Sequence, residues 1–145
     1  KVVFMGTPDF SVGTLKAIVE AGHEVAAVVT QPDKPKGRGG AMSFSDVKQA
    51  AIELGLLVLQ PKRARDEEFV NELRKINPDV IVVVAFGQIL SKEILDMPKY
   101  GCVNVHASLL PKYRGASPIQ WAVIDGCEYS GVTTMIPVIF FLLKK

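Results

Sequence analysis

The feature that most constrains this 145-residue chain is a set of short apolar runs without charge, each of which stops at a glycine or a polar residue. The clearest run covers residues 80–84, which are all β-branched and lie between Asp79 and Gly87. Strands that are buried on both faces of a parallel sheet have this composition. Strands are therefore predicted at residues 2–5, 25–29, 57–59, 80–84, 102–105 and 131–135.

The stretches between these runs are typical of helices. Ser11 is expected to cap a helix that buries Leu15, Ile18 and Val19 and ends at Gly22. Further helices are predicted at 45–54, from a cap at Asp66 to 76, at 91–96 and at 117–125, while residues 31–43 predict a loop rich in Gly and Pro. This alternation predicts a single α/β domain with a Rossmann-like, doubly wound and mostly parallel sheet.

Composition excludes several classes of protein. The net charge of +2 is too small for a general nucleic-acid binder. The two cysteines, Cys102 and Cys127, form no C-x-x-C pair, so neither a zinc site nor any other metal site is expected. The longest apolar run, residues 135–143, is half the length that spans a bilayer, and no secretory leader opens the chain. We therefore expect a cytoplasmic monomer without a membrane partner.

Ligands of a doubly wound sheet bind beyond the carboxyl ends of its strands. The segments expected there are residues 6–11, 30–43, 85–90 and 104–116. The first segment, GTPDFS, lacks the second and third glycines of G-x-G-x-x-G, which disfavours a dinucleotide. It is either a tight turn or, with Phe10, the floor of a substrate pocket.

The second segment carries Lys34, Lys36 and Arg38 among glycines and prolines. These cations either belong to a solvated loop or grip phosphate groups at the mouth of a site. The neighbouring glycines at 37, 39 and 40 would let such a loop fold over the end of a nucleic acid. A second basic cluster, residues 62–65, is expected to face solvent.

The fourth segment brings an amide and an imidazole to one side of a strand, at Asn104 and His106. Asn104 offers an N–H donor and His106 can move a proton, a pair that suits a developing oxyanion. The alternative is a structural histidine bonded to loop backbone. The region shows no G-x-S-x-G, and Ser108 is a poor nucleophile candidate because it lacks a third partner.

The run Asn104-x-His106-x-Ser108-Leu109-Leu110-Pro111-x-x-Arg114-Gly115 resembles the signature of the 10-formyltetrahydrofolate-dependent formyltransferases. Three further motifs, at residues 4–10, 30–39 and 115–120, resemble the branch of that family that acts on initiator tRNA. Formyltransferases for glycinamide ribonucleotide or sugar amines share the N-x-H and the Leu-Pro loop. They are not expected to share the 30–39 segment.

The resemblance implies transfer of a formyl group from 10-formyltetrahydrofolate to the methionine amino group of initiator methionyl-tRNA. It implies that Asn104 and His106 are catalytic and that Lys34, Lys36 and Arg38 contact the tRNA acceptor end. The residues that it places around the folate are Phe86, Gly87, Gln88, Ile89, Leu90, Ser108, Leu109, Leu110 and Pro111.

The chain departs from the family after the strand at 131–135. The family carries an aspartate that orients the histidine, yet no Asp follows Asp125, and without gaps that position falls near Leu142. Either this segment differs from the family or a loop is missing from it. The family's second, β-barrel domain is absent too, so we expect residues 1–145 to be a catalytic N-terminal portion, incomplete at its C-terminal end.

The missing aspartate predicts folate affinity with little or no formyl transfer, because a histidine without its orienting carboxylate loses control of its tautomer. Two alternatives stay open at this point. One is a formyltransferase that acts on a sugar amine or a ribonucleotide amine. The other is a folate-binding module without catalysis.

Overall fold

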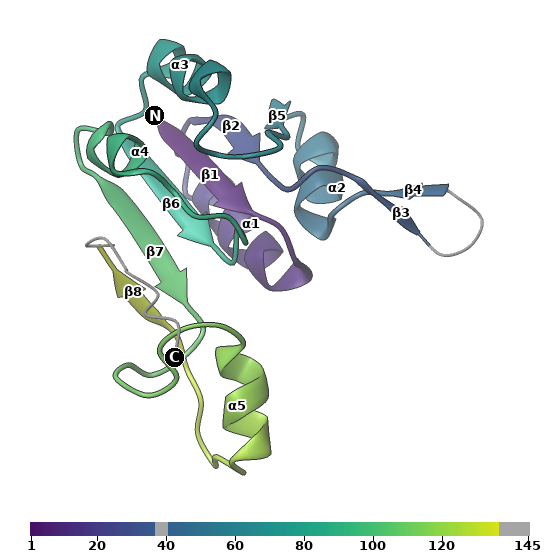
Figure 1. Ribbon diagram of the computed structural model, residues 1–145, viewed down its shortest axis with the longest axis vertical. Coiled ribbons are helices and arrows are strands. Elements are labelled where there is room, and N and C mark those ends of the chain that lie inside the picture. Colours follow the sequence, from purple (N-terminus) through teal and green to yellow (C-terminus); the bar gives the residue numbers. More distant parts are fainter. Residues whose placement is uncertain (37–40, 137–145) are drawn as a thin grey trace.

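A six-stranded sheet forms the centre of the computed structural model, which describes residues 1–36 and 41–136 (Figure 1). Its strands are β1 (Val2–Gly6), β2 (Val25–Val29), β5 (Val58–Leu59), β6 (Val80–Val84), β7 (Cys102–His106) and β8 (Thr133–Met135). They lie in the order β5-β2-β1-β6-β7-β8, and only β8 is antiparallel to its neighbour. The predicted doubly wound, mostly parallel α/β sheet is confirmed.

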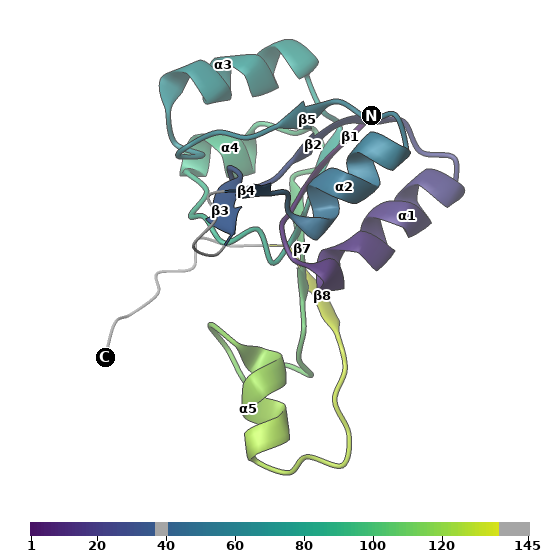
Figure 2. The same cartoon turned by 90° about the vertical axis from the view of Figure 1, so that its right-hand side faces the viewer.

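Helices cover both faces of the sheet. The helices are α1 (Val12–Glu20), α2 (Asp46–Glu53), α3 (Glu67–Ile76), α4 (Lys92–Asp96) and α5 (Pro118–Ile124). Figure 2 shows α1 and α2 on one face, α3 and α4 on the other, and α5 apart from the sheet beyond the ends of β7 and β8. Among the described residues, no helix has the length and apolar composition needed to cross a bilayer.

The core lies in two layers because successive side chains of a strand point to opposite faces. All of β1 is buried. Phe4 packs with Leu15 of α1 on one face, whereas Met5 packs with Leu73 of α3 on the other. The uncharged composition of the strands is thus explained by burial on both sides.

Ser11 occupies the expected N-cap position of α1, but the prediction that its side chain caps the helix is wrong. A short 3₁₀ turn, η1 (Asp9–Ser11), runs directly into α1, so the backbone of Ser11 is already helical. Its buried hydroxyl donates instead to the carbonyl of Val84, at 2.7 Å. This bond satisfies a buried carbonyl at the end of β6 and ties the start of α1 to that strand. Asp66 does occupy the N-cap position of α3, but its side chain makes no capping bond.

The expected loop at 31–43 is in part a hairpin, so that prediction is corrected. It holds two short antiparallel strands, β3 (Lys34–Lys36) and β4 (Ala41–Ser43), which project away from the sheet (Figure 1). Pro35 pairs with Met42, and a two-stranded ribbon tolerates a proline because its strands are both edges. Arg38 and the glycines at 37, 39 and 40 lie outside the described residues.

Candidate functional site

The order of the strands places a topological switch point between β1 and β6. From β1 the chain winds towards β2 and β5 on one side, and later through β6 and β7 on the other. Loops diverge at such a switch point, and ligands of doubly wound sheets bind there. The segments that follow β1, β2 and β6 meet at this point.

A ring of hydrogen bonds joins those three segments around the carbonyl of Phe86. The hydroxyl of Thr7 donates to that carbonyl at 3.0 Å, and the Nε2 of Gln31 donates to it at 3.2 Å. The backbone N–H of Gln31 closes the ring on the Thr7 hydroxyl, at 3.4 Å. Of the four segments expected beyond the strand ends, three are thus joined through Thr7, Gln31 and Phe86, and the fourth, 104–116, takes no part in this ring.

The 85–90 loop contains both buried and exposed side chains. Phe86 is buried, whereas 79% of Ile89 is exposed. Gln88 accepts a hydrogen bond from the N–H of Ala64 at 2.7 Å and donates to the carbonyl of Pro61 at 3.2 Å. The side chain of Gln88 thus anchors the loop to a neighbouring segment, which leaves backbone groups to face a ligand.

Asn104 and His106 are half-buried near the end of β7, on the same side of the strand. The Nε2 of His106 lies 2.8 Å from the carbonyl oxygen of Tyr113. A carbonyl only accepts, so this contact assigns the proton to Nε2 and leaves Nδ1 as the acceptor of the neutral ring. The alternative, a structural histidine bonded to loop backbone, thus accounts for Nε2 and leaves the role of Nδ1 open to the chemistry.

Ser108 supports the loop that follows β7. It is buried, and its hydroxyl donates to the carbonyl of Lys112 at 2.8 Å. Thr133 of β8 donates to the carbonyl of Ser108 at 2.7 Å and accepts from the N–H of Leu110 at 3.2 Å. A hydroxyl that is engaged in this way agrees with the expectation that Ser108 is no nucleophile.

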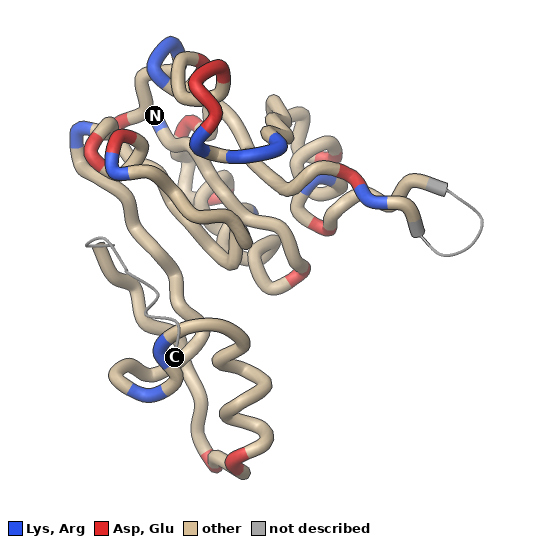
Figure 3. The backbone as a smooth tube through the Cα atoms, in the orientation of Figure 1, with Lys and Arg blue, Asp and Glu red and all other residues tan. Residues whose placement is uncertain are grey.

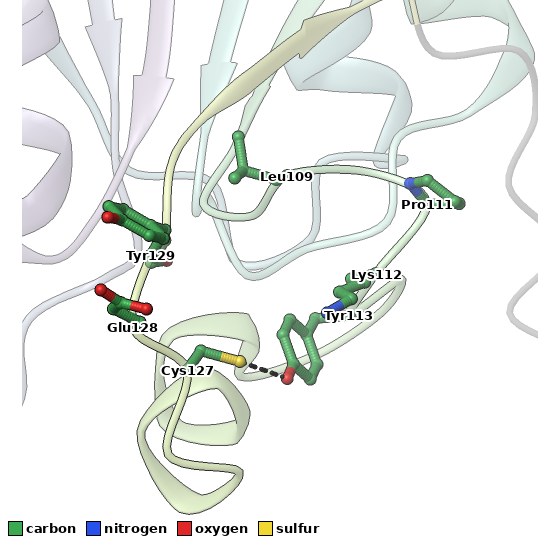
Figure 4. Close-up of a pocket in the computed structure, with 8 residues that line it drawn as sticks. Leu109, Pro111, Lys112, Tyr113, Cys127, Glu128 and Tyr129 are labelled. Carbon is green, nitrogen blue, oxygen red and sulfur yellow. Dashed lines mark hydrogen bonds between the residues drawn. The ribbon is translucent and has the colours of Figure 1, made fainter.

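A cavity of about 440 Å³ lies beyond this loop (Figure 4). It is lined by Leu109, Pro111, Lys112, Tyr113, Cys127, Glu128, Tyr129 and Ser130. Of the residues expected around a folate, Leu109 and Pro111 line this cavity, and the 86–90 segment does not contribute to its lining.

Tyr113 forms one wall of that cavity and was missed by sequence reasoning. Its hydroxyl lies 3.0 Å from the sulfur of Cys127 and donates to Asp125 at 2.8 Å. The contact with Cys127, and then the one with Asp125, raises the pKa of this hydroxyl. Because the Tyr113 carbonyl holds His106, these contacts at the end of α5 steady the imidazole as well.

The base of the β3–β4 hairpin is a second polar cluster that the sequence did not reveal. Asp33 forms an ion pair with Lys48 of α2, whose ammonium also lies over the Phe44 ring at 3.9 Å. The amide of Gln60 donates to Asp33 at 2.8 Å and to the carbonyl of Gln31 at 2.9 Å. Gln31 and Asp33 stand inside the 30–39 motif, but nothing in the sequence pointed to Lys48 or Gln60.

The pH dependence of stability tests this cluster. The hydrogen bond from Lys48, and then that from Gln60, lowers the pKa of Asp33 below its ordinary value of 3.8. A depressed carboxylate pKa stabilises the fold above the unfolded-state pKa, and this contribution is lost as the pH falls through the lower, folded-state pKa. We expect Asp33→Asn to be less stable than the parent at pH 7, and the two to converge below pH 3.8. Urea unfolding across pH 2.5–7 checks this, and a difference that does not change with pH contradicts it.

The chain matches a protein-family model described as formyl transferase over residues 1–137. The methionyl-tRNA formyltransferase of Lachnospira eligens is 76% identical over 135 residues, which cover 93% of this chain and 43% of that protein. The one from Clostridioides difficile is 62% identical, with 93% of this chain and 44% of that protein covered. The chain thus spans less than half the length of these relatives.

Solved structures agree on the fold. The phosphoribosylglycinamide formyltransferase of Bacillus halodurans has a TM-score of 0.70 at 20% identity, covering 92% of this chain and 69% of that one. A glycinamide ribonucleotide transformylase from Symbiobacterium toebii has a TM-score of 0.73 at 17% identity, covering 94% and 65%. The resemblance noted in the sequence is confirmed by the match over residues 1–137: the chain belongs to the formyl transferase family.

Proposed function

We propose that this chain is the catalytic N-terminal portion of an enzyme that formylates the methionine of initiator methionyl-tRNA, with 10-formyltetrahydrofolate as the donor. The observation that carries the proposal is the 76% identity, over 93% of the chain, to a methionyl-tRNA formyltransferase. The geometry at the end of β7 is consistent with it, since Asn104 and His106 supply the two groups that the chemistry needs.

Asn104 and His106 divide the work of the reaction. The amide of Asn104 donates to the oxygen that becomes negative when the methionine amine adds to the formyl carbon. The Nδ1 of His106 takes the proton of the attacking amine and returns it to N10 of the folate as the C–N10 bond breaks. The Tyr113 carbonyl holds Nε2–H throughout, at 2.8 Å, which keeps Nδ1 in its accepting form. The backbone of 86–90 and 108–111 holds the folate, and positioning supplies the remainder of the rate.

A chimera with the full length of a relative tests the proposal, because this chain spans less than half of that length. The 135 matching residues of this chain replace their counterparts in the Lachnospira eligens protein, and the product is assayed for formyl-methionyl-tRNA. We expect transfer to initiator methionyl-tRNA and none to glycinamide ribonucleotide or to a sugar amine. Transfer to a small amine alone favours a formyltransferase that acts on a sugar amine or a ribonucleotide amine. Binding of a formylfolate analogue without turnover favours a folate-binding module without catalysis. For the 145-residue chain itself, donor binding with little transfer stays a prediction.

The cations of the hairpin are expected to serve the tRNA. Replacing Lys34, Lys36 and Arg38 by glutamine in the chimera should raise the KM for tRNA by about 10- to 100-fold at physiological salt. The slope of log KM against log salt should fall by about two to three, because each phosphate contact contributes about 0.7–0.9 to it. Steady-state kinetics from 50 to 200 mM salt measure both quantities.

The basic cluster at 62–65 offers a matched control. Lys62, Arg63 and Arg65 are three exposed cations in a short segment, and Figure 3 shows this basic stretch apart from the β3–β4 hairpin. Neutralising them should change the KM for tRNA by less than about threefold. Equal effects of the two triple variants would mean that general charge attraction, and not the hairpin, binds the tRNA.

A further inference from the structure

We propose that Gln31 is a positioning residue, which locks the base of the β3–β4 hairpin to the 85–90 loop so that the tRNA side and the folate side of the site are held as one unit. The proposal rests on the proposed function for the roles of the two sides. Gln31 acts through the 85–90 loop and not through the reacting atoms themselves.

The first argument is the place of Gln31 in the hydrogen-bonded ring. It follows β2 and reaches across the switch point to a carbonyl that follows β6, 55 residues further along the chain. Its own backbone N–H contacts Thr7, which follows β1. Through its side chain and its backbone N–H, one residue therefore joins the segments that follow β1, β2 and β6.

The second argument is that Gln31 is braced from the hairpin side. Its carbonyl accepts from Gln60, and the same amide nitrogen of Gln60 donates to Asp33, one residue before β3. Asp33 in turn pairs with Lys48, and these two side chains are only 18% and 14% exposed. A shift of the hairpin base is therefore transmitted to Gln31 through bonds that are shielded from water.

The third argument is the glycine opposite Gln31. Gly87 has a φ of +80°, and a Cβ there would lie 2.3 Å from the Nε2 of Gln31. The side-chain amide of Gln31 thus occupies the space that a side chain at position 87 would need. Because the Phe86–Gly87 peptide is planar and trans, fixing the Phe86 carbonyl towards Gln31 turns the Gly87 N–H to the opposite side. Gln31 in this way sets the direction of a backbone donor in a loop that we propose to hold the folate.

The main experiment compares Gln31→Glu and Gln31→Ala in the chimera. Glutamate keeps the length of the side chain but cannot donate to Phe86 when ionised. We expect both variants to raise the KM for 10-formyltetrahydrofolate about tenfold, which corresponds to about 1.4 kcal/mol, while kcat and the KM for tRNA change less than about threefold. The control Gln49→Glu alters an exposed glutamine of α2 and should change neither kcat nor either KM value. A donor KM within twofold of the parent in Gln31→Glu overturns the proposal.

Asp33→Asn tests whether the two sides act as one unit. Asp33 lies at the hairpin base and is joined to Gln31 through the amide of Gln60. We therefore expect Asp33→Asn to raise the donor KM about threefold. Contacts in one network are not additive, and the double variant Gln31→Ala/Asp33→Asn should therefore match Gln31→Ala alone. An unchanged donor KM in Asp33→Asn, or full additivity, overturns the proposal. Thermal melts confirm that each variant is folded.

A measurement without turnover separates this proposal from the proposed function. Amide hydrogen exchange of residues 86–90 in the 145-residue chain should be about tenfold faster in Gln31→Glu than in the parent or in Gln49→Glu, because the loop loses an anchor. Unchanged exchange overturns the role of Gln31 whatever the enzyme does. If the exchange accelerates but the parent chimera formylates no tRNA, the proposed function fails and the structural link stands.

Discussion

His106→Ala is expected to lower the kcat of the chimera about 10³-fold, within the range of 10²–10⁴ that a positioned acid–base group contributes. Both KM values should stay within about threefold, since the imidazole is held by the Tyr113 carbonyl and acts only when the amine attacks. Single-turnover formylation of methionyl-tRNA at saturating substrates measures the chemical step directly.

Two companion variants sharpen this expectation. Asn104→Ala should cost about 10²–10³ in kcat, the usual effect of removing one oxyanion donor, and the double variant should lose less than the product of the two. His23→Ala is the matched control, because His23 is exposed and is the only other histidine of the chain. Product formation at an undiminished rate in the double variant would contradict the assignment of both residues.

Gly6→Ala is expected to lower the free energy of unfolding by about 2–3 kcal/mol, a typical cost of overpacking. A Cβ at this position, the buried end of β1, would lie 2.8 Å from the Cβ of Ser11 and 3.0 Å from the carbonyl oxygen of Val84. Ser11 is the last residue of η1 and directly precedes α1, and Val84 is the last residue of β6, so neither atom can move without shifting a whole element. Urea unfolding of the chain, monitored by circular dichroism, gives the difference.

Gly13→Ala should act in the opposite direction. Gly13 lies in α1, and nothing occupies the space within 4 Å of a Cβ built there. Alanine is the better helix former, so this variant should be more stable by about 0.5–1 kcal/mol. If both glycine variants lose similar amounts, the close approach of α1 to the end of β6 is not what requires Gly6.

The sheet could be predicted from the sequence because burial on both faces leaves a local signature. Residues 80–84 carry no polar side chain, and they form β6. The same reasoning placed β7 and, at its end, Asn104 and His106. The composition of a strand reflects its burial between two layers of helices. A window of about five residues is therefore enough to identify a buried strand.

The connections within the site could not be predicted, because they join segments that are remote in the chain. Gln31 meets Phe86 across 55 residues, and Gln60 meets Asp33 across 27. The sequence around a loop glutamine does not indicate which distant carbonyl its side chain will bond. The cap at Ser11 failed for a related reason, since a hydroxyl that suits a helix end suits a buried strand carbonyl equally well.

The position of β1 between β2 and β6 has a consequence for how the chain is made. Val2 pairs with Val25 on one side and with Val80 on the other, so the partner for one edge leaves the ribosome long after the strand itself. At ~5–20 residues per second, the nascent chain carries an unpaired, wholly apolar ribbon for several seconds or more. Chaperones that bind emerging polypeptides therefore have their natural target at the start of this chain, and synthesis without them should send more product into inclusion bodies.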